Sequence, residues 1–169
     1  GLAQGSANAQ SDDQDAQVIP DVWDLHIVGD GPERGAIEQL IASAGPQAVS
    51  RIHLLGYKSG EDLQREVGNA RFTVLSSEWR ENMPYSGLES LAAQTPIIGA
   101  RIGGIPELVE EGKTGVTFES GDAVDLLNSM RKCSAVSASS YSSMQRFCRE
   151  YVNARCLQNK YALTLRSEE

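Results

Sequence analysis

Two glutamates separated by seven residues are the side chains best placed to do chemistry in this sequence. Glu81 lies in a polar loop, and Glu89 lies near the start of a segment with helical spacing. Carboxylates accept hydrogen bonds from hydroxyl groups, so the pair could bind a hydroxyl-rich ligand. A structural role is open as well, because Ser86 and Glu89 have the spacing of a capping box that satisfies the start of a helix.

The elements around Glu81 and Glu89 predict where such a ligand would sit. An apolar run at 72–75 precedes the loop, and a second apolar run at 96–100 follows the helical segment. This order is typical of a βαβ unit whose long loop lies at the carboxyl end of a strand. Open α/β sheets bind ligands at that edge, so the stretch predicts a ligand site there.

The rest of the chain repeats the same alternation. Segments 24–28 and 51–55 are predicted to be two more strands, and each ends in a glycine turn at Gly29 or Gly56. Ile37, Leu40, Ile41 and Ala44 recur at helical spacing between these runs and are expected to face the core. Strands alternating with helices imply a parallel sheet. We therefore predict an α/β fold: a doubly wound parallel sheet of four to five strands with helices on both faces.

Four motifs in this order resemble a known family, the glycosyl transferases group 1. They are Val28-Gly29-Asp30-Gly31-Pro32-Glu33-Arg34, Leu54-Leu55-Gly56-Tyr57, the Glu81/Glu89 pair, and Gly103-Gly104-Ile105-Pro106-Glu107. The chain resembles the carboxyl-terminal, donor-binding half of retaining nucleotide-sugar glycosyltransferases with the GT-B fold. The resemblance implies a Rossmann-like donor-binding domain at residues 18–133.

The resemblance also implies a role for each motif. Glu81 would be the catalytic residue, beside the donor sugar, and Glu89 would accept hydrogen bonds from the ribose. The glycine turns would lie near the phosphates and the base, and backbone N–H groups after Glu81 would face the sugar and the distal phosphate. The implied donor-binding residues are Gly29, Gly56, Tyr57, Asn82, Met83, Tyr85, Ser86 and Glu89.

The function implied is transfer of a hexose from a UDP- or GDP-linked sugar to an unknown acceptor, without a metal or other cofactor. An amino-terminal GT-B domain or a partner chain would bind the acceptor, and this chain alone would be inactive. Two alternatives stay open: a catalytically inactive nucleotide-sugar-binding fragment or interaction domain, and a GT-B sugar-nucleotide epimerase.

Two stretches depart from the family pattern. Residues 1–17 have the composition of a disordered tail or linker, where the family has a strand and a basic loop whose Arg and Lys hold the donor diphosphate. Gln94 and Thr95 stand where a small residue and a glycine are usual. Residues 134–169 are expected to form a serine-rich connector and a terminal helix. The cations near the expected site are Arg34, Lys58, Arg80 and Arg101.

Composition excludes several other classes of protein. The net charge of −8 argues against a nucleic-acid partner. No apolar run approaches the ~20 residues of a transmembrane segment. The cysteines are Cys133, Cys148 and Cys156, and this odd set without paired spacing indicates a reducing, cytoplasmic location. No Cys/His cluster has metal-ligand spacing, so no metal site is expected.

Overall fold

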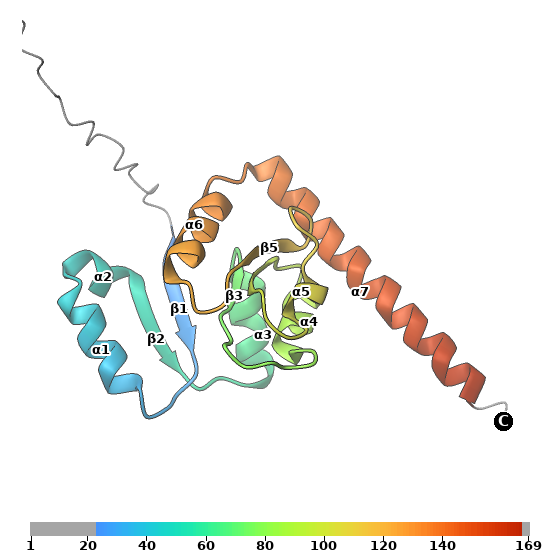
Figure 1. Cartoon of the computed structure of the whole chain (residues 1–169), viewed down its shortest axis with the longest axis horizontal. Coiled ribbons are helices and arrows are strands. Elements are labelled where there is room, and N and C mark those ends of the chain that lie inside the picture. Colours follow the sequence, from blue (N-terminus) through green and yellow to red (C-terminus); the bar gives the residue numbers. More distant parts are fainter. Residues whose placement is uncertain (1–22, 167–169) are drawn as a thin grey trace, which may run out of the picture.

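A computed structural model describes residues 23–166, with side chains described to residue 155 (Figure 1). The expected tail at 1–17 lies outside the described residues. Strands and helices alternate as predicted. The elements are β1 (Leu25–Val28), α1 (Arg34–Ser43), α2 (Pro46–Arg51), β2 (Ile52–Gly56), α3 (Gly60–Asn69), β3 (Thr73–Leu75), α4 (Tyr85–Ala92), β4 (Ile97–Ala100), α5 (Ile105–Leu108), β5 (Gly115–Phe118), α6 (Ala123–Ser134) and α7 (Ala138–Arg166).

The strands pair in parallel, which confirms the α/β fold, but they divide between two sheets. β1 pairs with β2, and β3, β4 and β5 form the second sheet in that order. Figure 1 shows the β1–β2 pair with α1 and α2 on its outer side, next to the compact unit built on β3, β4 and β5. The single continuous sheet that the sequence predicts is therefore interrupted between β1 and β3.

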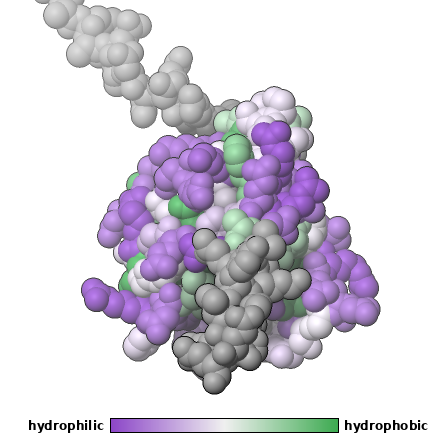
Figure 2. Space-filling model, turned by 90° about the vertical axis from the view of Figure 1, so that its right-hand side faces the viewer, coloured by the Kyte–Doolittle hydropathy of each residue, from purple (hydrophilic) through white to green (hydrophobic). Residues whose placement is uncertain are grey.

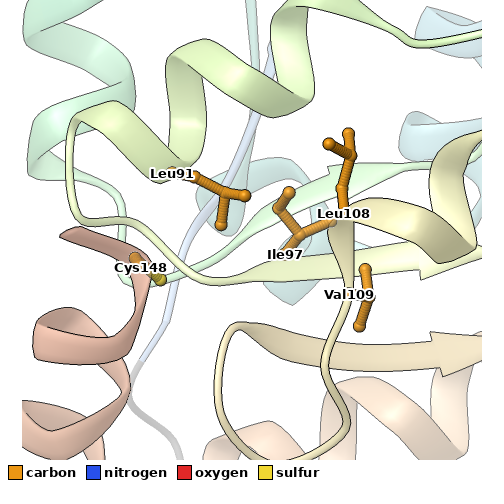
Figure 3. Packing of buried hydrophobic residues seen from close by; sticks show 5 residues of the cluster. All are labelled: Leu91, Ile97, Leu108, Val109 and Cys148. Carbon is orange, nitrogen blue, oxygen red and sulfur yellow. The ribbon is translucent and has the colours of Figure 1, made fainter. Parts of the chain in front are cut away.

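The core is centred on β4, whose four residues are all buried. The face of the molecule in Figure 2 is largely hydrophilic, so apolar residues gather inside. Successive strand residues point to opposite faces, and Ile97 and Ile98 accordingly enter different clusters. Leu91, Ile97 and Leu108 point toward one another on one face (Figure 3). The other cluster consists of Ile98, Ala100, Ile105, Phe118 and Cys133.

The part of the chain before Pro84 is packed far more loosely. None of residues 23–83 is fully buried, and this includes every residue of β1, β2 and β3. In α1, Ile37 and Ile41 are half-buried, while Leu40 is 68% exposed. The core stripe expected on this helix therefore forms only in part, because few other side chains cover it.

Helix α7 closes the structure on the α4 side. It begins at Ala138, inside the segment expected to be a connector, because the Ser137 hydroxyl accepts a hydrogen bond from the Ser140 N–H (3.2 Å) and caps the helix. Its side chains Met144 and Cys148 are buried. None of the helices in the described part of the chain has the length and apolar composition that crossing a membrane requires.

A cationic side chain joins the beginning of β1 to the beginning of α7. The guanidinium of Arg71 lies 5.0 Å from the ring centre of Trp23 and 4.5 Å from that of Tyr141. It also donates a hydrogen bond to the Val136 carbonyl (2.9 Å). Cation–π contacts of this kind are worth ~0.5–2 kcal/mol each, so Arg71 fastens three segments that are distant in sequence.

The end of α4 explains the departure at Gln94. Gln94 has φ 60°, a left-handed conformation that glycine usually adopts directly after a helix. Its N–H donates a hydrogen bond to the Leu91 carbonyl (3.0 Å). The turn keeps its shape although a residue with a Cβ occupies it.

Gln94→Gly is expected to stabilise the fold by ~0.5–1 kcal/mol. Relief of left-handed strain is worth about 1–2 kcal/mol, and the greater freedom of glycine in the unfolded chain offsets part of it. Urea unfolding with an unchanged m-value measures the difference. The control Ala93→Gly, at a residue with φ −75°, should destabilise by a similar amount. If Gln94→Gly and Ala93→Gly changed the free energy of unfolding by the same amount and in the same direction, left-handed strain at Gln94 would not affect the stability of the fold.

Candidate functional site

The turn after β4 holds the loop that carries Glu81. Since β3 and β4 are parallel, the segments after them meet at one edge of the sheet. The Gly104 N–H donates to the Glu81 carbonyl oxygen (2.7 Å). A Cβ on Gly103 would lie 2.5 Å from the same oxygen, and one on Gly104 would overlap the Asn82 carbonyl. The two glycines therefore allow the turn to touch the loop backbone and set the position of Glu81.

Both glutamates present free carboxylates. Glu81 and Glu89 are exposed, and no hydrogen bond or ion pair of either side chain is formed with the described residues. Helix α4 starts at Tyr85 with Pro84 as its N-cap, so Ser86 lies within the helix. The alternative capping box of Ser86 and Glu89 therefore does not form. Glu89 stays available to a ligand.

The start of α4 leaves backbone donors unpaired. Its N-cap provides no side-chain hydrogen bond, and within the described residues the N–H groups of Tyr85 and Ser86 have no acceptor. Helix N-termini with free N–H groups favour anions. Asn82 and Met83 are also exposed, and Tyr85 is 83% exposed. This group of predicted residues is thus brought together on one surface.

A second group of predicted residues meets at the carboxyl ends of β1 and β2. The Gly29 N–H donates to the Gly56 carbonyl (2.8 Å), and both glycines have positive φ, 139° and 70°. Tyr57, the next residue, is 77% exposed. Beside them lies a pocket of about 250 Å³, lined among others by Gly29, Arg34 and Leu54.

The structure does not join these two groups. The pocket at Gly29 is lined by no residue of the Glu81 loop or of α4. β1 and β3, whose ends carry the two groups, belong to different sheets. The residues predicted for the site therefore fall into two groups, one on each side of the interruption between the sheets.

Three of the four cations near the site are already paired. Arg34 binds Glu38 (3.0 Å), Lys58 binds Glu66 (2.7 Å), and Arg101 binds Glu119 (3.3 Å) and Asp125 (3.0 Å). The hydrogen bond from Lys58, with another from His26, lowers the pKa of Glu66. Arg80, next to Glu81, has no such partner in the described part of the chain. It is therefore the cation best able to meet an anionic ligand.

A separate cluster could hold a divalent cation. One ligand atom from each of Asp24, His26 and His53 lies within 4.8 Å of the others. The histidines face each other across β1 and β2, in register. Sequence reasoning found no Cys/His cluster with metal-ligand spacing and missed this one, because strand register brings it together. Asp24 precedes β1 and Gly29 follows it, so the cluster lies at the opposite end of the strand from the candidate site.

Comparison with known proteins identifies the family. A sequence profile described as "Glycosyl transferases group 1" matches residues 13–135. The chain belongs to this family. Among relatives in the glycosyltransferase family, sulfoquinovosyl transferase SQD2 of Arabidopsis thaliana is 33% identical over 110 residues, 63% of this chain and 20% of that protein. N-acetyl-alpha-D-glucosaminyl L-malate synthase of Bacillus anthracis is 36% identical over 98 residues, 58% of this chain and 24% of that protein.

Solved glycosyltransferase structures share the fold. HepE (Alr3699) of Anabaena, in complex with UDP, superposes with a TM-score of 0.71 at 21% identity, over 86% of this chain and 41% of that one. Sucrose-phosphate synthase of Thermosynechococcus elongatus gives 0.68 at 23% identity, over 86% and 39%. The expected GT-B glycosyltransferase domain is confirmed. The chain spans about a fifth to a quarter of the two relatives and about two fifths of the two solved chains.

Gly104→Ala is expected to displace the Glu81 loop of this glycosyltransferase domain. The added methyl group overlaps the Asn82 carbonyl, and overpacking of this kind costs ~1–3 kcal/mol. Urea unfolding measures this loss, and trypsin should cut after the exposed Arg80 severalfold faster. In the control Gly35→Ala, the new Cβ meets nothing within 4 Å. Unchanged cleavage at Arg80 in Gly104→Ala would mean that the turn does not position the loop.

Proposed function

We propose that this chain is the donor-binding domain of a retaining glycosyltransferase that transfers a hexose from a UDP- or GDP-linked sugar. The observation that carries the proposal is the pair of exposed, unpartnered carboxylates at Glu81 and Glu89, with the uncapped start of α4 between them. Support for the donor class comes from HepE of Anabaena, which was solved with UDP and with UDP-glucose.

The proposed chemistry follows from the charge that develops as the nucleoside diphosphate leaves the sugar. The leaving phosphate gathers negative charge, which the free N–H groups at the start of α4 and the Arg80 guanidinium would stabilise. Glu89 accepts hydrogen bonds from the ribose, and Glu81 orients the sugar through its hydroxyl groups. No step in this scheme requires a metal.

The remaining residues contribute backbone groups and shape. Asn82 and Met83 line the sugar side of the loop through their N–H groups, while Gly29 lies toward the phosphates. Gly56 and Tyr57 lie toward the base. We place the enzyme in the cytoplasm, since Cys133 and Cys148 are free thiols that suit a reducing compartment.

Activity is proposed to need a second domain. Closure of two domains over the donor excludes water and positions the acceptor, whereas Glu81 and Glu89 here face solvent. The second candidate function is a nucleotide-sugar-binding fragment without activity. The pairing of Arg34, Lys58 and Arg101 with carboxylates favours it, because little positive charge is left for a diphosphate.

Glu89→Gln is expected to weaken both UDP and UDP-glucose by about tenfold to a hundredfold. A hydrogen bond to a charged group is worth roughly 1.5–3 kcal/mol, and the ribose is common to both ligands. The matched variant Glu81→Gln should weaken UDP-glucose and leave UDP almost unchanged, because its partner is the hexose. Isothermal titration calorimetry of both variants with both ligands gives the four affinities.

Two outcomes of that titration would contradict the assigned roles. If Glu89→Gln lowers the melting temperature without changing either affinity, Glu89 supports the helix rather than the ribose. If Glu81→Gln weakens both ligands equally, Glu81 acts on the loop or the phosphates. GDP and GDP-mannose, titrated in parallel, test the choice of base.

The purified 169-residue chain is expected to transfer no sugar above the rate of spontaneous donor hydrolysis. Its candidate site is open to water, and the proposed second domain would be needed to position the reacting carbon. Release of UDP from UDP-glucose, followed with a panel of sugar and lipid acceptors, measures the rate. Sustained turnover by the single chain would overturn the requirement for a second domain.

A further inference from the structure

Both histidines of this 169-residue chain meet at one place on the β1–β2 sheet. His26 and His53 are the two histidines of the sequence, and they are register partners in the parallel pair of β1 and β2. Their ring centres lie 5.2 Å apart, at an interplanar angle of 85°. The two imidazoles are therefore close enough to bind one small ligand together.

An aspartate belongs to the same group. Asp24 lies two residues before His26, and residues two apart along an extended chain share a face. Its Oδ2 lies 3.6 Å from the Nε2 of His53, which is too long for a hydrogen bond. Two ligands of one tetrahedral zinc ion, each at about 2.0–2.2 Å from the metal, lie roughly 3.4 Å apart. The separation of Asp24 and His53 thus suits a shared ion better than a direct bond.

The third ligand needs only a small movement. One ligand atom from each of Asp24, His26 and His53 lies within 4.8 Å of the others. The side chains of Asp24, His26 and His53 are 53%, 48% and 38% exposed, so rotation of an imidazole meets little resistance from packing. The same exposure lets an ion reach the group from solvent.

A carboxylate outside the group orients His26. The Nδ1 of His26 lies 3.1 Å from the Oε2 of Glu66 in α3, and the Lys58 ammonium binds the Oε1 of that carboxylate (2.7 Å). An ionised carboxylate only accepts hydrogen bonds, so the neutral imidazole carries its proton on Nδ1 and has a free lone pair on Nε2. Histidines that bind metals almost always donate their other ring N–H in this way.

We infer that Asp24, His26 and His53 bind one Zn²⁺ ion, with water as the fourth ligand. Imidazole nitrogens and a carboxylate oxygen are zinc ligands, and three protein ligands with one water form a tetrahedral site. Ca²⁺ and Mg²⁺ are disfavoured, because both prefer ligand sets made of oxygen.

The ion would have a structural role. The group lies at the amino ends of β1 and β2, whereas the Gly29 and Gly56 turns follow their carboxyl ends. Zinc would join the start of β1 to β2, in the part of the chain where none of residues 23–83 is fully buried. The inference does not depend on sugar-nucleotide binding.

Zinc titration of the 169-residue chain without a polyhistidine tag tests the inference. Because the chain has two histidines, the ¹⁵N spectrum of its imidazole rings contains the signals of His26 and His53 alone. Zinc chloride should shift the ring nitrogens of both, and calorimetry should give one ion per chain. EDTA should reverse both effects. At free zinc ten times the Kd, amide exchange in β1 and β2 should slow about tenfold.

Substitutions separate the ligands from the residue that orients one of them. Glu66→Gln keeps both rings and should weaken zinc by about 10- to 100-fold, the usual loss when such an outer partner is removed. His26→Gln and His53→Gln each remove a ligand and should weaken zinc further. The matched control Glu61→Gln, at an exposed residue of the same helix, should leave the affinity unchanged.

Urea unfolding in EDTA shows whether each variant remains folded. If a variant does not fold, the ring-nitrogen shifts of the parent chain still decide, because they need no substitution. Three results would overturn the inference. They are no binding at millimolar zinc, binding that leaves the signals of His26 and His53 unmoved, and a zinc-dependent dimer in sedimentation, which would mean that two copies share the ion. Equal losses in Glu66→Gln and Glu61→Gln would overturn the role of Glu66. None of these readouts involves UDP-glucose, so they are separate from failure of the chain to bind a donor.

Discussion

Burial of β4 on both faces is the interaction on which the rest of the structure depends. This strand pairs with β3 on one edge and β5 on the other, and its alternating residues supply both hydrophobic clusters. At Gly99 a Cβ would lie 2.7 Å from the Ile105 side chain, so α5 packs directly on the strand. The loop with Glu81 begins at the end of β3, and the turn that holds it begins at the end of β4. The positions of both therefore depend on this sheet.

The first part of the chain is held in a different way. Polar and cation–π contacts dominate there: Arg71 lies between Trp23 and Tyr141, and Glu66 binds Lys58 and His26. The ion pair of Lys58 with Glu66 is only half-buried, and ion pairs with access to solvent contribute little to stability. We therefore expect β1, β2 and α1 to open at lower free energy than β4 and α4.

The fold class followed from the sequence because apolar runs and helical periodicity are local signals. The motifs around Gly29, Gly56, Glu81 and Gly103 were sufficient to predict the family. The order of strands in a sheet is not a local property. Periodicity identified β1 and β3 as strands but could not show that they are not neighbours.

The same limit hid the pairing of Lys58 with Glu66 and the facing histidines of β1 and β2. The i,i+4 spacing of Arg34 and Glu38 was a visible signal for one of the missed ion pairs. The capping box at Ser86 does not form for a local reason: the helix already starts at Tyr85, directly after Pro84, so Ser86 is inside the helix and cannot be its N-cap.

The contact of Gly104 with the Glu81 loop also bears on how such proteins diversify. The path of the loop is set by backbone groups and by two glycines of a neighbouring turn, not by the loop's own side chains. Trp79, Arg80, Asn82 and Met83 are exposed, and exposed substitutions away from caps and cores usually change stability by no more than ~0.5 kcal/mol. Mutation can therefore alter the surface that the loop presents while its shape persists. The chemistry of this surface can change with little risk to folding.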